Sequence, residues 1–317
     1  MRVVFIGASR FGLRCLDVVR ALPGMDVVGV VTNAAVFTIS YAPAGVTNVL
    51  HADIASYAAA AALPCAVMQK NMTEPELIAQ VAAWRPELFL VVGWYHMVPR
   101  RWRVLAPAFG LHASLLPDYS GGAPLVWAMI DGAKQTGITL FQMGDGVDDG
   151  PILGQAATEI LAADTIATLY ARIETLGLGL LRRELPRLAQ GEAVLTPQDE
   201  AARRVFPQRK PEDGRIDWHQ DAARIYDFIR AQTRPYPGAF SVCAGRRLTI
   251  WAAQPTLWPD QAAVAGALVQ TKDGKILVVC AYGTALELIE VGKADAPVSA
   301  SEWWRSLPEP PGAFDAD

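Results

Sequence analysis

One stretch of the sequence decides the fold, and residues 109–132 read FGLHASLLPDYSGGAPLVWAMIDG. In this stretch His112 precedes Ser114-Leu115-Leu116-Pro117, where the proline ends the local structure, and a Gly-Gly-Ala-Pro turn follows. Such a pattern predicts a shaped loop at the end of a strand. Open α/β sheets bind their ligands at the carboxyl ends of their strands, so this loop is a candidate site.

Outside this stretch, strand-like and helix-like segments alternate along the chain. Short apolar runs predict strands, and apolar residues at helical spacing predict helices between them. One helix is expected to begin at Thr73-Glu74-Pro75-Glu76, which fits a capping box. The alternation indicates a parallel α/β sheet. We expect strands at 3–6, 27–31, 88–93, 137–142 and 151–160, and helices at 11–22, 73–84 and 164–190.

The first turn between a strand and a helix reads Gly-Ala-Ser-Arg-Phe-Gly at residues 7–12. Its two glycines lie five residues apart and do not form the G-x-G-x-x-G pattern in which backbone meets a pyrophosphate. We therefore favour a plain strand-to-helix turn over a nucleotide-cofactor site.

The character of the sequence changes after the long helix. Residues 192–214 are polar and interrupted by prolines, which is typical of a linker. A helical pattern at 221–231 follows, and then several short runs rich in valine, isoleucine and threonine that predict a small antiparallel barrel. We expect a first domain over 1–191, a linker over 192–207 and a second domain over 208–317.

Composition excludes several classes of protein. The chain has 317 residues, of which 52% are hydrophobic and 19% charged, so it is neither disordered nor fibrous. No apolar run approaches the roughly 18 residues of a membrane span, and the N-terminal run is too short for a signal peptide, which predicts a cytoplasmic protein without a membrane partner. A net charge of −4 does not favour a polyanion such as DNA. The four cysteines, which have no C-x-x-C spacing, predict free thiols and no metal site.

The block from 109 to 153 resembles the folate-dependent formyltransferase family, which includes methionyl-tRNA formyltransferases and sugar-nucleotide N-formyltransferases. The family signature is Asn-x-His-x-Ser-Leu-Leu-Pro, followed 36 residues after the histidine by an aspartate; His112 and Asp148 have this spacing. The resemblance continues in Arg209 to Trp218 and in Tyr236-Pro237-Gly238, and so covers nearly the whole chain. It implies a Rossmann-like catalytic domain followed by a small open β-barrel of OB type.

The resemblance also implies a reaction, in which a substrate amine attacks the formyl carbon of N10-formyltetrahydrofolate. His112 is assigned to proton movement and Asp148 to orienting its ring. The family's asparagine, an oxyanion donor, is replaced by Gly110, and Ser120 stands where the family usually has arginine. Loss of one oxyanion donor costs on the order of 10²–10³ in rate, so Gly110 implies either a slow enzyme or another donor in place of the amide. We favour replacement because His112, Asp148 and the rest of the signature are intact. The substitutes considered are Tyr95, His96, Ser120, a main-chain amide near Gly110 or a water.

The same resemblance places the folate pocket on segments after two strands and on the loop around Asp148. The residues expected to bind folate are Trp94, Tyr95, Met97, Ser114, Leu115, Leu116, Pro117, Val147, Asp149 and Gly150. No metal is expected to take part.

The formyl acceptor is expected to be a small amine, most of all an amino-sugar nucleotide. Residues 21–69 contain no lysine or arginine, and residues 206–317 have twelve basic against fourteen acidic residues, so tRNA is the second choice. A third alternative is a different function: with the asparagine absent, the chain would be a diverged folate-binding protein or a formyltetrahydrofolate hydrolase. The sequence leaves the oligomeric state open, a homodimer included. The basic residues considered for a pyrophosphate are Arg10, Arg209, Lys210 and Arg234, and neither His51 nor His219 is given a catalytic role.

Overall fold

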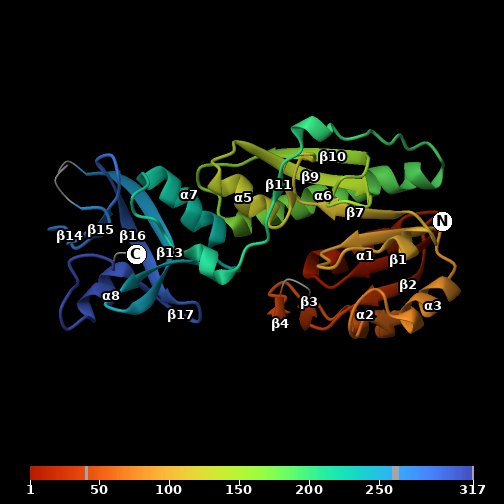
Figure 1. Ribbon diagram of the computed structural model, residues 1–317, viewed down its shortest axis with the longest axis horizontal. Helices are drawn as coiled ribbons and strands as arrows, with labels where there is room; N and C mark the ends of the chain where they lie inside the picture. The colour runs from red at the N-terminus through yellow and green to blue at the C-terminus, as the bar shows by residue number, and fades with distance from the viewer. Residues whose placement is uncertain (40–41, 259–263, 316–317) are drawn as a thin grey trace. The chain divides into compact units, whose positions relative to one another are not determined.

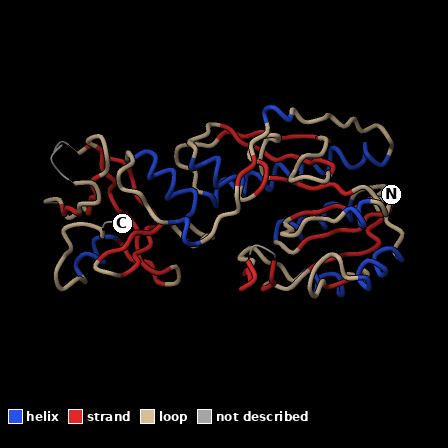
Figure 2. The backbone as a smooth tube through the Cα atoms, in the orientation of Figure 1, coloured by secondary structure: helices blue, strands red, loops and turns tan. Residues whose placement is uncertain are grey.

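The computed structural model describes residues 1–39, 42–258 and 264–315, and the chain forms two compact units. The segments Gly122–Lys134 and Glu159–Tyr170 belong to the second unit, although they precede the polar stretch that was expected to join two domains. Figure 2 distinguishes the helices, strands and loops of both units. The first unit comprises Met1–Gly121, Gln135–Thr158 and Ala171–Phe206, and the second comprises Gly122–Lys134, Glu159–Tyr170 and Pro207–Asp317.

A seven-stranded sheet forms the centre of the first unit, with the strand order β10-β9-β7-β6-β1-β2-β5 (Figure 1). The strands from β5 to β7 pair in parallel, and β9 runs antiparallel to β7. The expected α/β fold with a parallel, Rossmann-like sheet is thereby confirmed. The strands are β1 (Arg2–Gly7), β2 (Asp26–Thr32), β5 (Cys65–Val67), β6 (Leu88–Val92), β7 (Ala108–His112), β9 (Gln135–Gln142) and β10 (Ile152–Glu159).

The strand order changes direction at β1. From β1 the chain moves outward through β2 to β5, and then returns to add β6 on the other side of β1. Connections that leave neighbouring strands in opposite directions open a crevice at their carboxyl ends, where α/β proteins bind ligands. Gly7 pairs with Val92, and Val91 pairs with Gly110, so the ends of β1, β6 and β7 lie side by side.

Helices cover both faces of this sheet. α1 (Arg10–Ala21) begins after Ser9, whose hydroxyl caps it by accepting from the Gly12 N–H, and it packs against β1, β2 and β6. The opposite face buries a cluster that includes Trp102 and Phe89. None of the helices within the described residues is both long and apolar enough to cross a membrane. The other helices of this unit are α2 (Ile54–Ala60), α3 (Pro75–Ala83), α4 (Arg100–Arg103) and most of α6 (Ile166–Ala189).

The capping box expected for α3 is wrong. The helix begins at Pro75, its N-cap is Glu74, and no side chain makes a capping hydrogen bond. The Thr73 hydroxyl donates instead to Asn71 Oδ1 at 2.6 Å, and Glu74 Oε1 accepts the backbone N–H of Lys70 at 2.8 Å. The preceding turn therefore engages the side chains that the sequence pattern assigned to the helix.

A short hairpin follows β2 and was not expected from the sequence. It consists of β3 (Val36–Ile39) and β4 (Ala42–Thr47), which pair antiparallel. Asn48 ties its end to the turn after β1, because its Nδ2 donates to the carbonyl of Ala8 at 3.0 Å. Both strands of the hairpin lie within residues 21–69, which contain no lysine or arginine.

The polar stretch after α6 contains ordered elements. β11 (Val205–Phe206) pairs in parallel with β8 (Ser120–Gly121), so the chain returns to the loop that follows His112. Two short 3₁₀ helices flank β11, η1 (Glu200–Ala202) and η2 (Pro211–Gly214).

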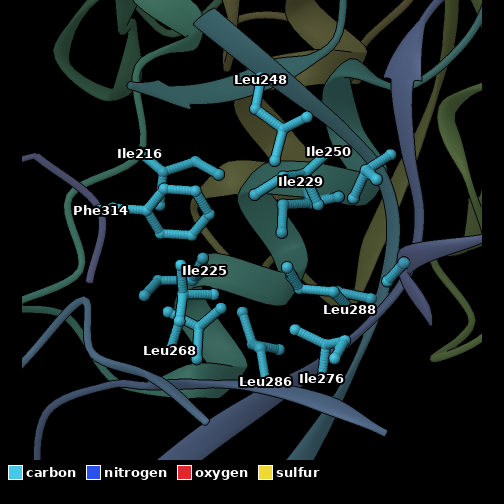
Figure 3. Close-up of a cluster of buried hydrophobic side chains, with 14 of the residues drawn as sticks. Ile216, Ile225, Ile229, Leu248, Ile250, Leu268, Ile276, Leu286, Leu288 and Phe314 are labelled. Atoms are coloured by element: carbon cyan, nitrogen blue, oxygen red, sulfur yellow. The ribbon is translucent and has the colours of Figure 1, made fainter. Parts of the chain in front are cut away.

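The second unit is built on an antiparallel sheet, as expected, with the order β12-β13-β16-β15-β14 and β17 paired to β16. Ile229 of α7 packs with Ile250, Leu286 and Leu288 in its core (Figure 3). Closure of this sheet as an OB-type barrel stays a prediction. The elements are α5 (Pro124–Ile130), α7 (Ala222–Gln232), β12 (Ala239–Cys243), β13 (Arg246–Leu257), β14 (Leu268–Gln270), β15 (Ile276–Val279), β16 (Thr284–Lys293), β17 (Ala296–Ser299) and α8 (Ala300–Arg305).

Candidate active site

His112 is the last residue of β7, at the edge where β1 and β6 also end. Its Nε2 lies 2.8 Å from the carbonyl oxygen of Tyr119, and only 11% of its side chain is exposed. A carbonyl oxygen can only accept, so Nε2 carries the proton in this contact. Nδ1 is therefore the ring nitrogen that is left to take up and release a proton.

Asp148 faces that nitrogen, with Oδ2 3.5 Å from Nδ1 of His112. The same oxygen accepts the backbone N–H of Gly121 at 2.8 Å. The backbone of Asp148 has a φ of 52°, in the left-handed region, which costs a non-glycine residue on the order of 1 kcal/mol. The surrounding contacts must hold this conformation, and they place the carboxylate beside the Nδ1 edge of the His112 ring.

The His loop, residues 113–121, is fixed by side chains that bond to its own backbone. The Ser114 hydroxyl donates to the carbonyl of Asp118 at 2.7 Å. Thr139 of β9 donates its hydroxyl to the Ser114 carbonyl at 2.7 Å and accepts the N–H of Leu116 at 3.1 Å. These bonds define the path from His112 to Tyr119, whose carbonyl orients the histidine ring.

The Asp loop, residues 144–150, is wrapped around a second carboxylate. Asp149 Oδ2 accepts the backbone N–H of Gly146 at 2.8 Å. A Cβ at Gly144 or Gly146 would lie 2.2 or 2.3 Å from an Asp149 carboxylate oxygen, so the loop closes tightly only because both residues are glycine. Asp149 is turned into its own loop, and Asp148 is the acid that faces the histidine.

Two protein-family models match this chain. Residues 1–185 match the family described as formyl transferase, and residues 209–308 match the formyl transferase C-terminal domain. The chain belongs to the formyl transferase family. The match to the first model covers more than half of the 317 residues, including His112 and Asp148.

Several solved structures share the fold at low sequence identity. An N-formyltransferase from Helicobacter canadensis, in complex with folinic acid and dTDP-3-aminofucose, is 16% identical over 90% of this chain and 98% of that one, with a TM-score of 0.64. HypX from Aquifex aeolicus with tetrahydrofolic acid is 17% identical over 96% of this chain, with a TM-score of 0.62. This chain spans about half the length of HypX, 46% in that structure. A methionyl-tRNA formyltransferase from Clostridium thermocellum is 18% identical over 91% of this chain and 99% of that one, with a TM-score of 0.53.

The asparagine of the formyl transferase pattern is Gly110 in this chain, in the middle of β7. A Cβ added to Gly110 would lie 2.6 Å from Cε of Met143 and 3.5 Å from the ring of Phe141. The backbone N–H of Met143 donates to the carbonyl of Ala108 at 2.7 Å, which anchors the methionine beside β7. The space that a larger residue at 110 needs is therefore filled by a methionine methyl group.

The three side chains considered as substitute donors differ in how they are engaged. The hydroxyl of Ser120 is fully buried and donates to the carbonyl of Pro117 at 3.2 Å. Tyr95 donates to Asn48 Oδ1 over a long 3.4 Å. The buried Nε2 of His96 has no hydrogen-bond partner within the described residues, and burial lowers the pKa of this imidazole, which favours its neutral form.

The residues expected to bind folate lie after β6, in the His loop and in the Asp loop. Ser114 and Leu116 are buried, so within the His loop Leu115 and Pro117 are the partly exposed members. Met97 after β6 is 59% exposed. The remaining members show intermediate burial at Trp94, Tyr95 and Asp149, exposure at Val147 and burial at Gly150.

The basic residues considered for a pyrophosphate are not equally available. Arg209 donates to Gln232 Oε1 at 2.7 Å, and burial lowers its pKa. Arg234 pairs with Glu290 at 3.1 Å. Arg10, at the start of α1, is exposed and donates to the carbonyl of Val49 over 3.4 Å. Lys210 is also exposed.

The hydrogen bonds and ion pairs of His219 and His51 in the described residues are made to groups other than His112 and Asp148. His219 is 84% exposed beside Asp217. His51 Nε2 lies 3.3 Å from the carbonyl oxygen of Asn33. No group of three or more histidine, cysteine, aspartate or glutamate side chains in the described part of the chain is arranged to hold a metal ion.

Sequence reasoning missed three residues that hold the two loops, because it read their segment as a linker. Gln198 donates to backbone carbonyls of the Asp loop at 2.6 and 2.7 Å. Arg203 donates to the carbonyl of Val147 in the same loop, and Arg204 forms a two-pronged ion pair with Asp118 of the His loop at 2.6 and 2.8 Å. The pairing of β11 with β8 is the structural sign of this arrangement, and no sequence motif announces it.

Proposed function

We propose that this protein is an N-formyltransferase that moves the formyl group of N10-formyltetrahydrofolate to a small amine. The observation that carries the proposal is the His112–Asp148 pair at the carboxyl edge of the sheet, with 3.5 Å between Nδ1 and Oδ2. Membership in the formyl transferase family supports it. The similar structures from Helicobacter canadensis and Aquifex aeolicus hold folinic acid and tetrahydrofolic acid, which supports a folate as the formyl donor.

The residues around this pair suit a reduced folate. Among the buried polar atoms without a partner in the described residues is Nε2 of His96, in the segment after β6 that was expected to line the folate pocket. Met97 and the indole of Trp94 add partly exposed apolar surface. The edges of a pterin ring carry hydrogen-bond donors and acceptors that need polar partners, whereas the faces of the ring pack against apolar side chains. Trp94, Met97 and the Asp loop would hold the pterin, and the bound folate supplies the formyl carbon.

The chemistry asks this chain to move one proton and to stabilise one negative charge. Nδ1 of His112 takes the proton that the attacking amine loses, while Tyr119 and Asp148 accept hydrogen bonds from the two N–H groups of the imidazolium. The same proton is then returned to the nitrogen that leaves the formyl carbon. For the charge on the formyl oxygen, His96 is our preferred side-chain donor, since its buried Nε2 lacks a partner within the described residues.

For the acceptor we propose an amino-sugar nucleotide. The hairpin β3–β4 and its neighbours lie in residues 21–69, which have no lysine or arginine, and an RNA acceptor would be met there by a neutral or acidic surface. The exposed guanidinium of Arg10, beside the end of this hairpin segment at Val49, is our candidate for a nucleotide phosphate. Methionyl-tRNA is the alternative acceptor.

One observation favours a second candidate function. The methyl group of Met143 lies where the Cβ of an asparagine at 110 would begin, and Gly110 itself has no side-chain donor, so the transition state has one polar partner fewer unless another group takes over. A protein in this condition would bind the folate without transfer, or would pass the formyl group slowly to water.

The three candidate functions, transferase, hydrolase and binding protein, differ in their products. The full chain is incubated with N10-formyltetrahydrofolate alone, with dTDP-3-aminofucose added, or with methionyl-tRNA added, and the products are identified by mass spectrometry. We expect a formylated sugar nucleotide, at least tenfold faster than formyl-methionyl-tRNA. Release of formate without amine indicates a hydrolase, and binding of folate without turnover indicates a binding protein. A faster reaction with methionyl-tRNA reverses the choice of acceptor.

A further inference from the structure

One segment after α6 contacts both loops of the active site. We call residues 196–206 the brace. It begins where Thr196 and Ile152 exchange two backbone hydrogen bonds, at 2.7 and 2.8 Å. It ends in β11, where Phe206 pairs with Gly121 of the His loop. Between these ends the brace passes first the Asp loop and then the His loop.

Gln198 fixes the backbone of the Asp loop on both sides of Asp149. Its side-chain Nε2 donates to the carbonyl of Asp148 at 2.7 Å and to the carbonyl of Gly150 at 2.6 Å. Asp148 is the residue with a φ of 52°, a conformation that a non-glycine residue keeps only when its surroundings enforce it. Gln198 uses both hydrogens of one amide group for this purpose.

The next residues of the brace extend the same support. Arg203 donates to the carbonyl of Val147, so the brace binds three backbone carbonyls of the Asp loop, those of Val147, Asp148 and Gly150. Arg103 of α4 holds Asp145 at the start of the loop. Side chains from outside the Asp loop therefore bind both its first part, at Asp145, and its last part, from Val147 to Gly150.

The brace also holds the carbonyl that orients His112. The guanidinium of Arg204 lies 4.9 Å above the ring of Tyr119, and the ring of Phe206 stacks on Tyr119 with 4.8 Å between centroids. Arg204 is bonded to Asp118, the residue before Tyr119, through both carboxylate oxygens. The Tyr119 carbonyl accepts from His112 Nε2, so its position sets the tilt of the imidazole.

We propose that Gln198 is a positioning residue for formyl transfer: it enforces the backbone of Asp148 and so sets the carboxylate against His112 and the Gly121 N–H. The proposal rests on the proposed function, because it concerns the pair to which that function assigns the proton transfer. The Gln198 amide bonds to backbone carbonyls, and not to the imidazole of His112 or the carboxylate of Asp148. It acts through Asp148, as the outer partners of metal ligands act through the ligands.

The first test compares Gln198→Leu with a matched control, Gln190→Leu, at an exposed position just after the end of α6. With N10-formyltetrahydrofolate and dTDP-3-aminofucose, we expect Gln198→Leu to lower kcat by about 10–100-fold and to leave KM for the folate within about threefold. The control should keep the wild-type kcat. An unchanged kcat in Gln198→Leu overturns the proposal.

Gln198→Glu adds a readout that a general loss of packing would not give. The ionised glutamate accepts but cannot donate, so it opposes the two carbonyl oxygens, whereas the protonated acid can donate to one of them. We expect kcat of Gln198→Glu, relative to wild type, to rise as the pH falls from 8 to 5.5. A ratio that stays constant or falls contradicts the donor role.

A measurement without turnover separates this proposal from the proposed function. The Gly121 N–H donates to Asp148 Oδ2, so its hydrogen exchange reports on the carboxylate directly. We expect this amide to exchange at least about tenfold faster in Gln198→Leu, while amides in the buried strand β1 keep their protection. If wild type transfers no formyl group but this change is seen, the function fails and the brace stands. Unchanged exchange at Gly121 overturns the brace.

Discussion

Cε of Met143 lies 2.6 Å from the position that a Cβ on Gly110 would occupy, so these two residues share one volume. Restoring the family's asparagine at 110 requires this methyl group to move. Because Cε is the end of a flexible side chain and the next contacts of the added Cβ are at 3.5 Å or more, Gly110→Asn alone should change the free energy of unfolding by no more than about 1 kcal/mol. The free energy of unfolding in urea measures this.

The double variant Gly110→Asn with Met143→Ala tests whether the lost donor has been replaced. Removing the methionine side chain leaves the volume beside residue 110 to the asparagine amide alone. If His96 or a main-chain amide already serves the formyl oxygen, kcat should stay within about tenfold of wild type. A rise of kcat by about 10² or more in the double variant would show that wild type lacks this donor.

His112→Ala should lower kcat by about 10²–10⁴-fold, because it removes the group that moves the proton. His112 is mostly buried, so folate binding, measured by calorimetry, serves as the check that the variant is folded. His219→Ala is the matched control, since that side chain is 84% exposed. Retention of most turnover in His112→Ala would refute the assignment of the site.

The stability of the protein should fall on mild acidification, in part because of His96. Burial lowers the pKa of His96, so below about pH 6.5, the ordinary histidine value, the unfolded chain binds a proton that the folded protein resists. The free energy of unfolding should then drop between pH 7.5 and 5.5, and His96→Phe should make this drop smaller. The same change in slope with His219→Phe as with His96→Phe would contradict this account.

The four cysteines should react slowly with alkylating reagents. Burial raises the pKa of Cys280 to about 12, and it also raises the pKa of Cys15, Cys65 and Cys243. Thiolates are the reactive species, so at pH 8 we expect little labelling by iodoacetamide within minutes. Cys65 is the least buried and should be labelled first. Mass spectrometry follows the labelling, and the unfolded protein in urea should take four labels.

The sequence predicted those features that a local pattern records. The apolar runs at 88–93 and 137–142 appear as β6 and β9, since buried strands need such residues over their whole length. The spacing from His112 to Asp148 drew attention to two side chains that lie 3.5 Å apart, while their catalytic roles stay predictions.

Features that depend on distant partners were out of reach. Gln198 bonds to two backbone carbonyls, and every residue has a carbonyl, so no sequence pattern marks the acceptor. Met143 fills the space beside Gly110 because β9 runs antiparallel to β7, a register that the sequence does not state. The Thr73 capping box failed for a related reason, since Asn71 offered its hydroxyl a competing acceptor.

The brace has a consequence for anyone who divides this chain into fragments. The match to the first formyl transferase model ends at residue 185, within α6, and a fragment cut there would contain His112, Asp148 and every strand of the first sheet. It would lack Gln198, Arg203, Arg204 and the strand that pairs with β8. Such a fragment has both members of the His112–Asp148 pair and none of the contacts from the brace, so a fragment meant to keep the geometry of this pair should extend at least through Phe206.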